Sequence, residues 1–215
     1  MASGNYTMDL ARLAASLTSK ALPKSLYGTL PIIVIDIIPA MLIGMVKPVY
    51  KSSTEALTNI HGNGGPHGED FLTALAAGYE GCARIGLASC SSVEDERGFH
   101  NPIINGQLAV AAAVGNLLSW DAATIASAMG VAASSSGGLV AFQTTDAKTK
   151  QIHPGHGGPL GIEAALMARA GVTGSPNILE NEMGFLHAFS PEPTYTQTLA
   201  SLRPWWTSTT VLPKL

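Results

Sequence analysis

Apolar residues recur at three- and four-residue spacing in two stretches of the first half of the chain, and this spacing predicts helices. The first stretch covers residues 8–17, and Pro23 marks a break after it. The second covers residues 71–85, where alanines and glycines separate the larger side chains. Glu69 and Asp70 fall in the first turn of this second helix, where the helix dipole favours acidic side chains.

The second half of the chain predicts four further helices from the same kind of spacing. They are expected over 107–118, from Asp121 to about Ala133, over 161–170 and over 177–189. Asp121 is suited to cap a helix N-terminus, and Ser175-Pro176 is typical of a cap followed by a proline in the first turn. No run alternates apolar and polar residues as a strand does, so the fold class is expected to be mainly α.

Residues 30–46 are apolar over a length close to the lower limit of about 17 residues for a membrane span. Asp36 lies near the middle, where an acid costs about 2.5–3.5 kcal/mol in a bilayer, and Pro31 and Pro39 interrupt the run. We therefore expect a buried core helix here and no membrane association. The N-terminus does not resemble a signal peptide, so we expect a soluble cytoplasmic protein and leave a mitochondrial location open.

Charged residues make up 13% of the 215 residues, about half of the usual share of about 25%, and hydrophobic residues make up 46%. So little charge indicates that another subunit covers part of the apolar surface. The net charge of −3 and the pI of about 6.0 give no cationic face for nucleic acid. The two cysteines, Cys82 and Cys90, form no disulfide framework and lack the spacing of a zinc site.

Histidines and lysines are few, and they gather at two places. One is the segment RGFHNP at 97–102, and the other is KTKQIHPGHGG at 148–158. We interpret the second as a glycine-rich turn in which the backbone can approach a ligand closely and Pro154 stiffens the chain. Such a turn can hold an anion and supply it with protons. The residues that we consider for this chemistry are His100, Lys148, Lys150, His153, Gly155 and His156, with Gly157 and Gly158 beside them.

Two other uses of this segment fit less well. His153 and His156 could bind a metal, but no third Cys, His or acidic residue is nearby in the sequence, so we expect no metal. The glycines resemble a phosphate cradle, yet there is no GxxxxGK[ST] motif and no preceding strand, which argues against nucleotide binding.

Five pieces of the chain occur in one order with plausible spacing, and together they resemble the MmgE/PrpD family. The pieces are GEDFLTALAAGYEGCARIG (68–86), GFHNP and the alanine-rich helix to 118, the Asp121 helix ending in ASSSGGL (133–139), TKQIHPGHGGPLGIEAALMARAGVTG (149–174) and ILENEMGFLHAF (178–189). Residues 36–44 also resemble the family's first helix, so the resemblance covers most of the chain.

The resemblance implies a fold, its domain bounds and the parts of the family fold that we expect to be missing. It implies a helical MmgE/PrpD-type domain over 1–190 and an irregular tail over 191–215 that corresponds to the start of the lid region. Members of the family are longer, so we expect the α/β lid domain to be largely missing. An aspartate-rich motif that faces the substrate in the family has no counterpart over 45–68.

The resemblance also implies roles for the candidate residues. His100 matches the family's active-site histidine, a general acid or base; a turn histidine ahead of a helix is the structural alternative. Lys150 and His153 match the family's K-x-x-H element, which would hold a carboxylate and move a proton. Lys148, Gly155 and His156 would border the substrate. Catalysis in this family is free of cofactors, so none is expected.

The expected activity is that of a lyase acting on a citrate- or aconitate-like tricarboxylic acid. An alkylcitrate from a specialised pathway is one substrate of this kind. The residues leave decarboxylation and dehydration both open. The alternative is a non-catalytic, truncated paralogue that pairs with a full-length relative. In either case we expect a homodimer, or a heterodimer with such a relative.

Overall fold

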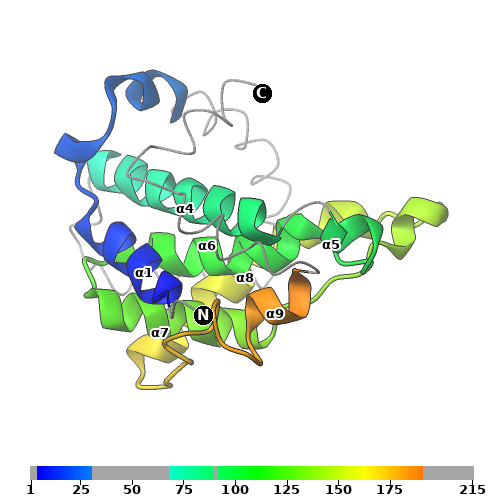
Figure 1. The fold of residues 1–215 in the computed structure, drawn as a ribbon. Coiled ribbons are helices and arrows are strands. Elements are labelled where there is room, and N and C mark those ends of the chain that lie inside the picture. The colour runs from blue at the N-terminus through cyan, green and yellow to red at the C-terminus, as the bar shows by residue number, and fades with distance from the viewer. Residues whose placement is uncertain (1–3, 31–67, 90–91, 191–215) are drawn as a thin grey trace.

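The structure, a computed structural model, describes residues 4–30, 68–89 and 92–190 of the chain (Figure 1). Within these ranges the elements are α1 (Tyr6–Ser16), η1 (Ser19–Ala21), α4 (Gly68–Ser89), α5 (Ser92–Asp95), α6 (Asn101–Leu117), α7 (Ala122–Ser134), η3 (Ala141–Thr144), α8 (Thr149–Arg169) and α9 (Phe185–Phe189). Residues 24–30 are also helical. The β structure of these ranges is one isolated bridge between Phe99 and Leu139. The prediction of a mainly α fold is confirmed.

Helix α6 lies at the centre of the described molecule, with α4, α7 and α8 packed around it and α1 against α6 and α7 (Figure 1). Its alanine-rich sequence has high helix propensity, and Pro102 in the first turn is compatible with a helix start. Ile104 and Leu108 are completely buried. The core is therefore built around one helix whose N-terminus follows His100 directly.

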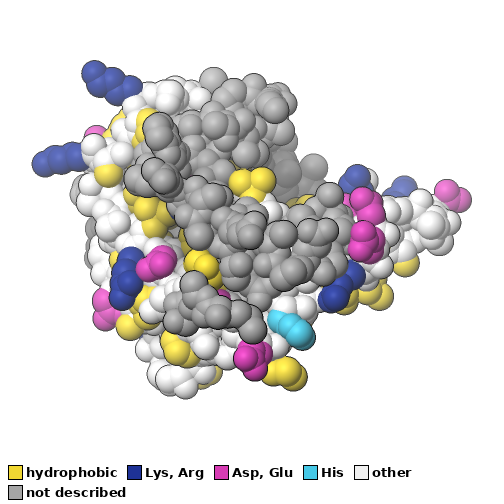
Figure 2. Space-filling view, viewed as in Figure 1, with side chains coloured by type: hydrophobic (Ala, Val, Ile, Leu, Met, Phe, Trp, Pro, Cys, Tyr) yellow, Lys and Arg dark blue, Asp and Glu magenta, His cyan; other side chains and the backbone are white. Residues whose placement is uncertain are grey.

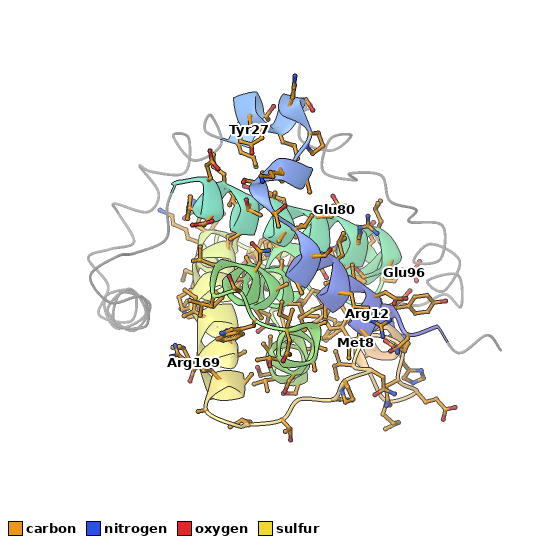
Figure 3. All side chains as sticks on the ribbon, turned by 90° about the vertical axis from the view of Figure 1, so that its left-hand side faces the viewer. Met8, Arg12, Tyr27, Glu80, Glu96 and Arg169 are labelled. Atoms are coloured by element: carbon orange, nitrogen blue, oxygen red, sulfur yellow. The ribbon has the colours of Figure 1, made fainter. Side chains whose placement is uncertain are left out.

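Helix α4 separates two apolar clusters. Its small residues, among them Ala77 and Gly81, face α6, where short side chains allow the two helices to approach closely. Its larger apolar residues Leu72, Leu75 and Tyr79 pack on the other side against Leu22, Leu26 and Leu30. Figure 3 shows the segment that carries Tyr27 lying over α4 on the side away from α6. In the described part of the chain, α4 therefore forms a layer between α6 and the segment that carries Leu22, Leu26 and Leu30.

The predicted helix starts and caps agree with the structure at several places. Helix α1 covers the predicted run, and α4 has Glu69 and Asp70 in its first turn. Asp121 caps α7, since its carboxylate accepts a hydrogen bond of 2.7 Å from the backbone N–H of Thr124. Gly171 ends α8 with a φ of 97°, a conformation that favours glycine.

The prediction of a glycine-rich turn over 148–158 is wrong, because α8 continues through these residues without interruption. Pro154 and Pro159 lie inside this helix, and each removes one backbone hydrogen bond. Packing outweighs that loss. Gly157 lies against the backbone of α6, and a Cβ added at Gly161 would meet the carbonyl oxygen of Gln107 at 2.5 Å. Gly157 and Gly161 therefore bring two helices together, and for Gly157 the expectation of a close approach to a ligand is corrected.

Two other boundaries differ from the prediction. Helix α6 begins at Asn101, earlier than the expected start at residue 107. The expected helix over 177–189 is reduced to α9, with turns before it. Asn181 accepts a hydrogen bond from the N–H of Met183, which competes with the helical pattern. A Cβ at Gly184 would overlap the Ile178 carbonyl, so the compact turn depends on that glycine.

Several predictions lie outside the described residues. They concern the apolar segment beyond Leu30 with Asp36, the family comparison over residues 36–67 and the tail over 191–215. Among the helices that the structure does describe, none combines the length and the apolar character needed to cross a membrane.

Candidate active site

His100 is held at the start of α6 by two short backbone segments that run antiparallel. Its N–H donates to the carbonyl oxygen of Gly138 at 2.9 Å, and the N–H of Val140 donates to the carbonyl oxygen of Gly98 at 2.9 Å. Gly98 and Gly138 have φ values of 73° and 132°, which side chains of L residues rarely adopt. The GFH segment and the SGG segment after α7 therefore fix the histidine together.

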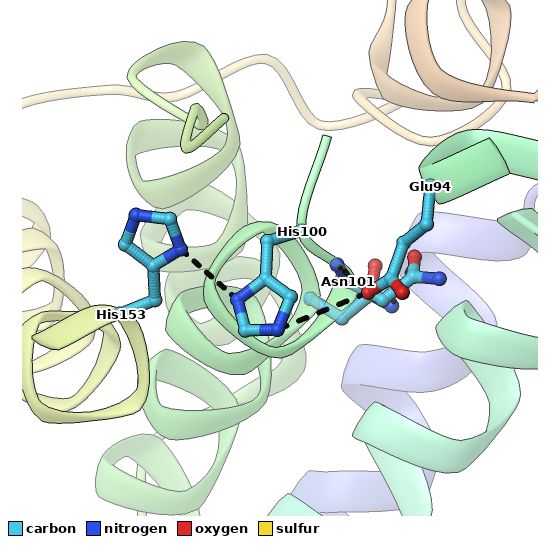
Figure 4. Close-up of polar contacts among 5 residues, drawn as sticks. Glu94, His100, Asn101 and His153 are labelled. Atoms are coloured by element: carbon cyan, nitrogen blue, oxygen red, sulfur yellow. Dashed lines mark hydrogen bonds and ion pairs between the residues drawn. The ribbon is translucent and has the colours of Figure 1, made fainter. Parts of the chain in front are cut away.

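The side chain of His100 meets His153 of α8. The two Nδ1 atoms lie 3.0 Å apart (Figure 4), and His100 is 5% exposed whereas His153 is half-buried. The ring of Phe142, from η3, packs edge-on against both histidines, with ring centroids 5.1 Å from His100 and 5.7 Å from His153. The structure thus joins two predicted residues from distant parts of the sequence into one histidine pair, of which His100 is the buried ring.

Glu94 of α5 lies on the opposite side of the His100 ring. Its Oε1 is 3.9 Å from Nε2 of His100 and accepts a hydrogen bond of 3.0 Å from the backbone N–H of Asn101 (Figure 4). Our sequence analysis missed this residue. The only signal was a cluster of acids just before RGFHNP, and nothing in the sequence distinguishes Glu94 from its exposed neighbours Asp95 and Glu96.

The surroundings of His100 favour its neutral form. Burial lowers the pKa of this imidazole, the negative charge of Glu94 raises the pKa, and the positive charges of His153 and Lys150 lower it again. Because burial is the largest effect, the pKa lies below its ordinary value of 6.5. A neutral imidazole near neutral pH can accept a proton, as a general base must.

The other predicted residues lie on the first turns of α8. Lys150 and His153 are three residues apart and so share one face of this helix, and the charge of Lys150 acts on His100. Lys150, Lys148 and His156 have exposed side chains, whereas Gly155 is half-buried in the helix. Within the described ranges, neither Lys148 nor His156 is hydrogen-bonded to the histidine pair.

The end of the molecule that contains these turns projects from the helical body (Figure 1). Figure 2 shows acidic and basic side chains together on this projecting end, whereas most of the visible described surface is neutral. The described residues include no group of three His, Cys, Asp or Glu side chains that could bind a metal ion. This arrangement can bind a carboxylate at Lys150 and exchange a proton through the pair of His100 and His153.

Residues 63–198 match the MmgE/PrpD N-terminal domain. The match extends over more than half of the chain, and the chain therefore belongs to the MmgE/PrpD family. The resemblance seen in the sequence is confirmed, and with it the helical domain type.

Named relatives support the same assignment. The chain is 29% identical to the cis-aconitate decarboxylase-like protein oryM of Aspergillus oryzae, over 80% of this chain and 37% of that protein. It is 32% identical to the cis-aconitate decarboxylase of Homo sapiens over 66% of this chain and 28% of the relative, and 30% identical to that of Aspergillus terreus over 69% and 31%. The family thus includes lyases, and the alignments span about a third of the length of these relatives.

Proposed function

We propose that this chain is a lyase that acts on a citrate- or aconitate-like tricarboxylic acid at His100, Lys150 and His153. The observation that carries the proposal is the contact of 3.0 Å between His100, buried at 5% exposure, and His153, on the helix face that also carries Lys150. A histidine pair with one buried ring, on a helix face that also carries an exposed lysine, suits an acid–base reaction on an anionic substrate.

Decarboxylation is the reaction that we favour, because similar proteins from Homo sapiens and Aspergillus terreus are named cis-aconitate decarboxylase and one from Aspergillus oryzae is named cis-aconitate decarboxylase-like. Lys150 would bind a carboxylate that stays on the substrate. As the bond to the departing carboxylate breaks, its electron pair remains on carbon and CO₂ leaves. The histidine pair then supplies a proton to that carbon. A cation held near the developing charge stabilises it in the transition state.

Dehydration would use the same residues in another order. A base would remove the proton α to a carboxylate while an acid protonates the departing hydroxyl group, so that water leaves. This reaction requires a hydroxylated substrate such as 2-methylcitrate or a longer alkylcitrate. Lys148 immediately precedes α8, and Gly155 and His156 lie in its first turns. We propose that these three residues border the outer end of either substrate.

The test is turnover by the purified chain. The protein is incubated with cis-aconitate, 2-methylcitrate and longer alkylcitrates, and mass spectrometry follows loss of CO₂ or of water. We expect CO₂ release from cis-aconitate that is abolished in His100→Asn and His153→Gln and retained in His187→Gln, which changes an exposed histidine of α9. No turnover of any substrate, together with tight association with a full-length relative, would contradict the proposal and favour a non-catalytic pairing role.

A further inference from the structure

We infer that Glu94, His100 and His153 form a directed proton relay, in which Nε2 of His153 is the atom that exchanges a proton with the substrate. Glu94 is a positioning residue in this arrangement, because it acts through His100 and is separated from His153 by that ring (Figure 4). The role toward substrate rests on the proposed function, whereas the arrangement of protons in the free protein does not.

The contact between the two histidines admits one proton only. Two Nδ1 atoms at 3.0 Å form a hydrogen bond when one carries hydrogen and the other presents a lone pair. Either His153 donates to His100, or His100 donates to His153. The two arrangements place the remaining nitrogen of His153 in opposite states, as a lone pair in the first and as an N–H in the second.

Glu94 selects the first arrangement. Its carboxylate oxygen faces Nε2 of His100 at 3.9 Å, and a negative charge there favours hydrogen on that nitrogen. The carboxylate is fixed in place because the same oxygen accepts a hydrogen bond from the N–H of Asn101, the first residue of α6. A neutral ring carries one N–H, so Nδ1 of His100 is then the acceptor.

This arrangement determines which nitrogen of His153 carries hydrogen. Its Nδ1–H donates to His100, and its Nε2 carries the free lone pair. His100 is 5% exposed, whereas His153 is half-buried on the helix face that also carries Lys150, so His153 is the ring within reach of a ligand. An orienting carboxylate that fixes the tautomer of a buried histidine is a known device in acid–base sites.

The relay accounts for the proton in decarboxylation. His153 takes a proton at Nε2 from water, and it delivers that proton to the substrate carbon that keeps the electron pair of the broken bond. The ring returns to its neutral form as the C–H bond is made. The charged groups that face the pair are Glu94 from α5 and Lys150 from α8, and Phe142 of η3 covers it with an apolar ring. A bound carboxylate would offset the charge of Lys150 while His153 is protonated.

Imidazole ¹⁵N chemical shifts test the relay without any turnover. In the neutral state of the free chain we expect N–H-type nitrogens at Nε2 of His100 and Nδ1 of His153, and lone-pair-type nitrogens at the other two positions. In Glu94→Gln, which removes the charge and keeps the shape, hydrogen should redistribute toward Nδ1 of His100. Glu96→Gln removes the same charge from an exposed neighbour and should leave the pattern unchanged. The reverse pattern in the unmodified chain, with hydrogen on Nδ1 of His100, would overturn the proposal.

Kinetics distinguish this positioning role from a purely structural one. Glu94→Gln should lower kcat by about tenfold or more with little change in KM, and Glu94→Asp should recover part of the loss because it keeps the charge. The basic limb of the pH–rate profile should move to lower pH in Glu94→Gln, since the carboxylate stabilises the protonated pair that donates the proton. A chain that shows the expected ¹⁵N pattern but no turnover would refute the proposed function and leave the proton arrangement intact. A kcat unaffected by Glu94→Gln would refute the relay alone.

Discussion

At the residue scale, His100 lies between the carboxylate of Glu94 and two groups that carry positive charge, His153 and Lys150. Its position excludes most water. Burial lowers its pKa in the folded protein, so the folded chain holds fewer protons than the unfolded chain once the pH falls below about 6.5. The stabilisation that comes from keeping this ring neutral is therefore complete above that pH and is lost progressively below it.

This linkage predicts how stability depends on pH. In chemical denaturation between pH 8 and pH 5, the free energy of unfolding should fall more on acidification for the unmodified chain than for His100→Asn. His187→Asn, an exposed control, should behave like the unmodified chain. Equal slopes for the unmodified chain and His100→Asn would show that His100 does not resist protonation.

Gly138 gives a second prediction at this scale. Its φ of 132° is strained for any side chain, and a Cβ there would overlap Ile103 and lie 3.6 Å from Cε1 of His153. Gly138→Ala should lower the free energy of unfolding by more than about 1 kcal/mol and should also reduce turnover. Gly137→Ala introduces the same group where nothing lies within 4 Å, so denaturation curves should separate the two variants. Identical curves would contradict this account.

At the scale of elements, the approach of α8 to α6 depends on Gly161. An added Cβ would lie 2.5 Å from the Gln107 carbonyl oxygen and 2.6 Å from Cβ of Val110. Gly161→Ala should therefore destabilise the fold by about 1–3 kcal/mol despite the better helix propensity of alanine. Gly158→Ala in the same helix meets nothing within 4 Å and should be neutral or stabilising by up to about 1 kcal/mol. Thermal denaturation of both variants decides this, and a stabilised Gly161→Ala would exclude the close packing.

Helix α1 is capped by a residue far along the sequence. A carboxylate oxygen of Glu180 accepts hydrogen bonds from the N–H of Thr7 at 3.1 Å and from its hydroxyl at 2.6 Å. The Thr7 hydroxyl also accepts from the N–H of Leu179 at 3.0 Å. Glu180→Ala should thus lower the free energy of unfolding by about 0.5–2 kcal/mol, whereas Glu182→Ala at an exposed neighbour should have little effect. Equal free energies of unfolding in urea for Glu180→Ala and the unmodified chain would contradict the cap.

The elements also show what the sequence could and could not predict. Helices with clear periodicity, such as α1, α4 and α7, were predicted because their signals lie within a few residues. The start of α8 was predicted as a turn because Pro154 and its glycines weaken a helix locally, whereas packing against α6 and the contacts of His153 stabilise the helix in the fold. In the site, His100 and His153 were predicted, but Glu94 was missed because its position beside His100 depends on how the short segment between them folds.

At the scale of the whole molecule, the low share of charged residues sets expectations about assembly. Its alignments span 28–37% of the curated relatives, and 13% of its residues are charged. Large apolar side chains such as Leu139 and Met183 are 62% and 88% exposed. We predict a homodimer in sedimentation velocity at micromolar concentration, because the low share of charged residues leaves apolar surface for a second subunit to cover. A single species of monomer mass at every concentration would contradict that prediction.

The central claim is that an acidic metabolite binds where Lys150 adjoins the histidine pair, and calorimetric titration with cis-aconitate tests it most directly. The unmodified chain should bind, and Lys150→Gln should weaken binding by about tenfold or more, the loss expected for a hydrogen bond to a charged group. Arg169→Gln removes the same charge from the exposed far end of α8 and should leave the affinity unchanged. Equal affinities for the unmodified chain and Lys150→Gln, or no binding at all, would contradict the account.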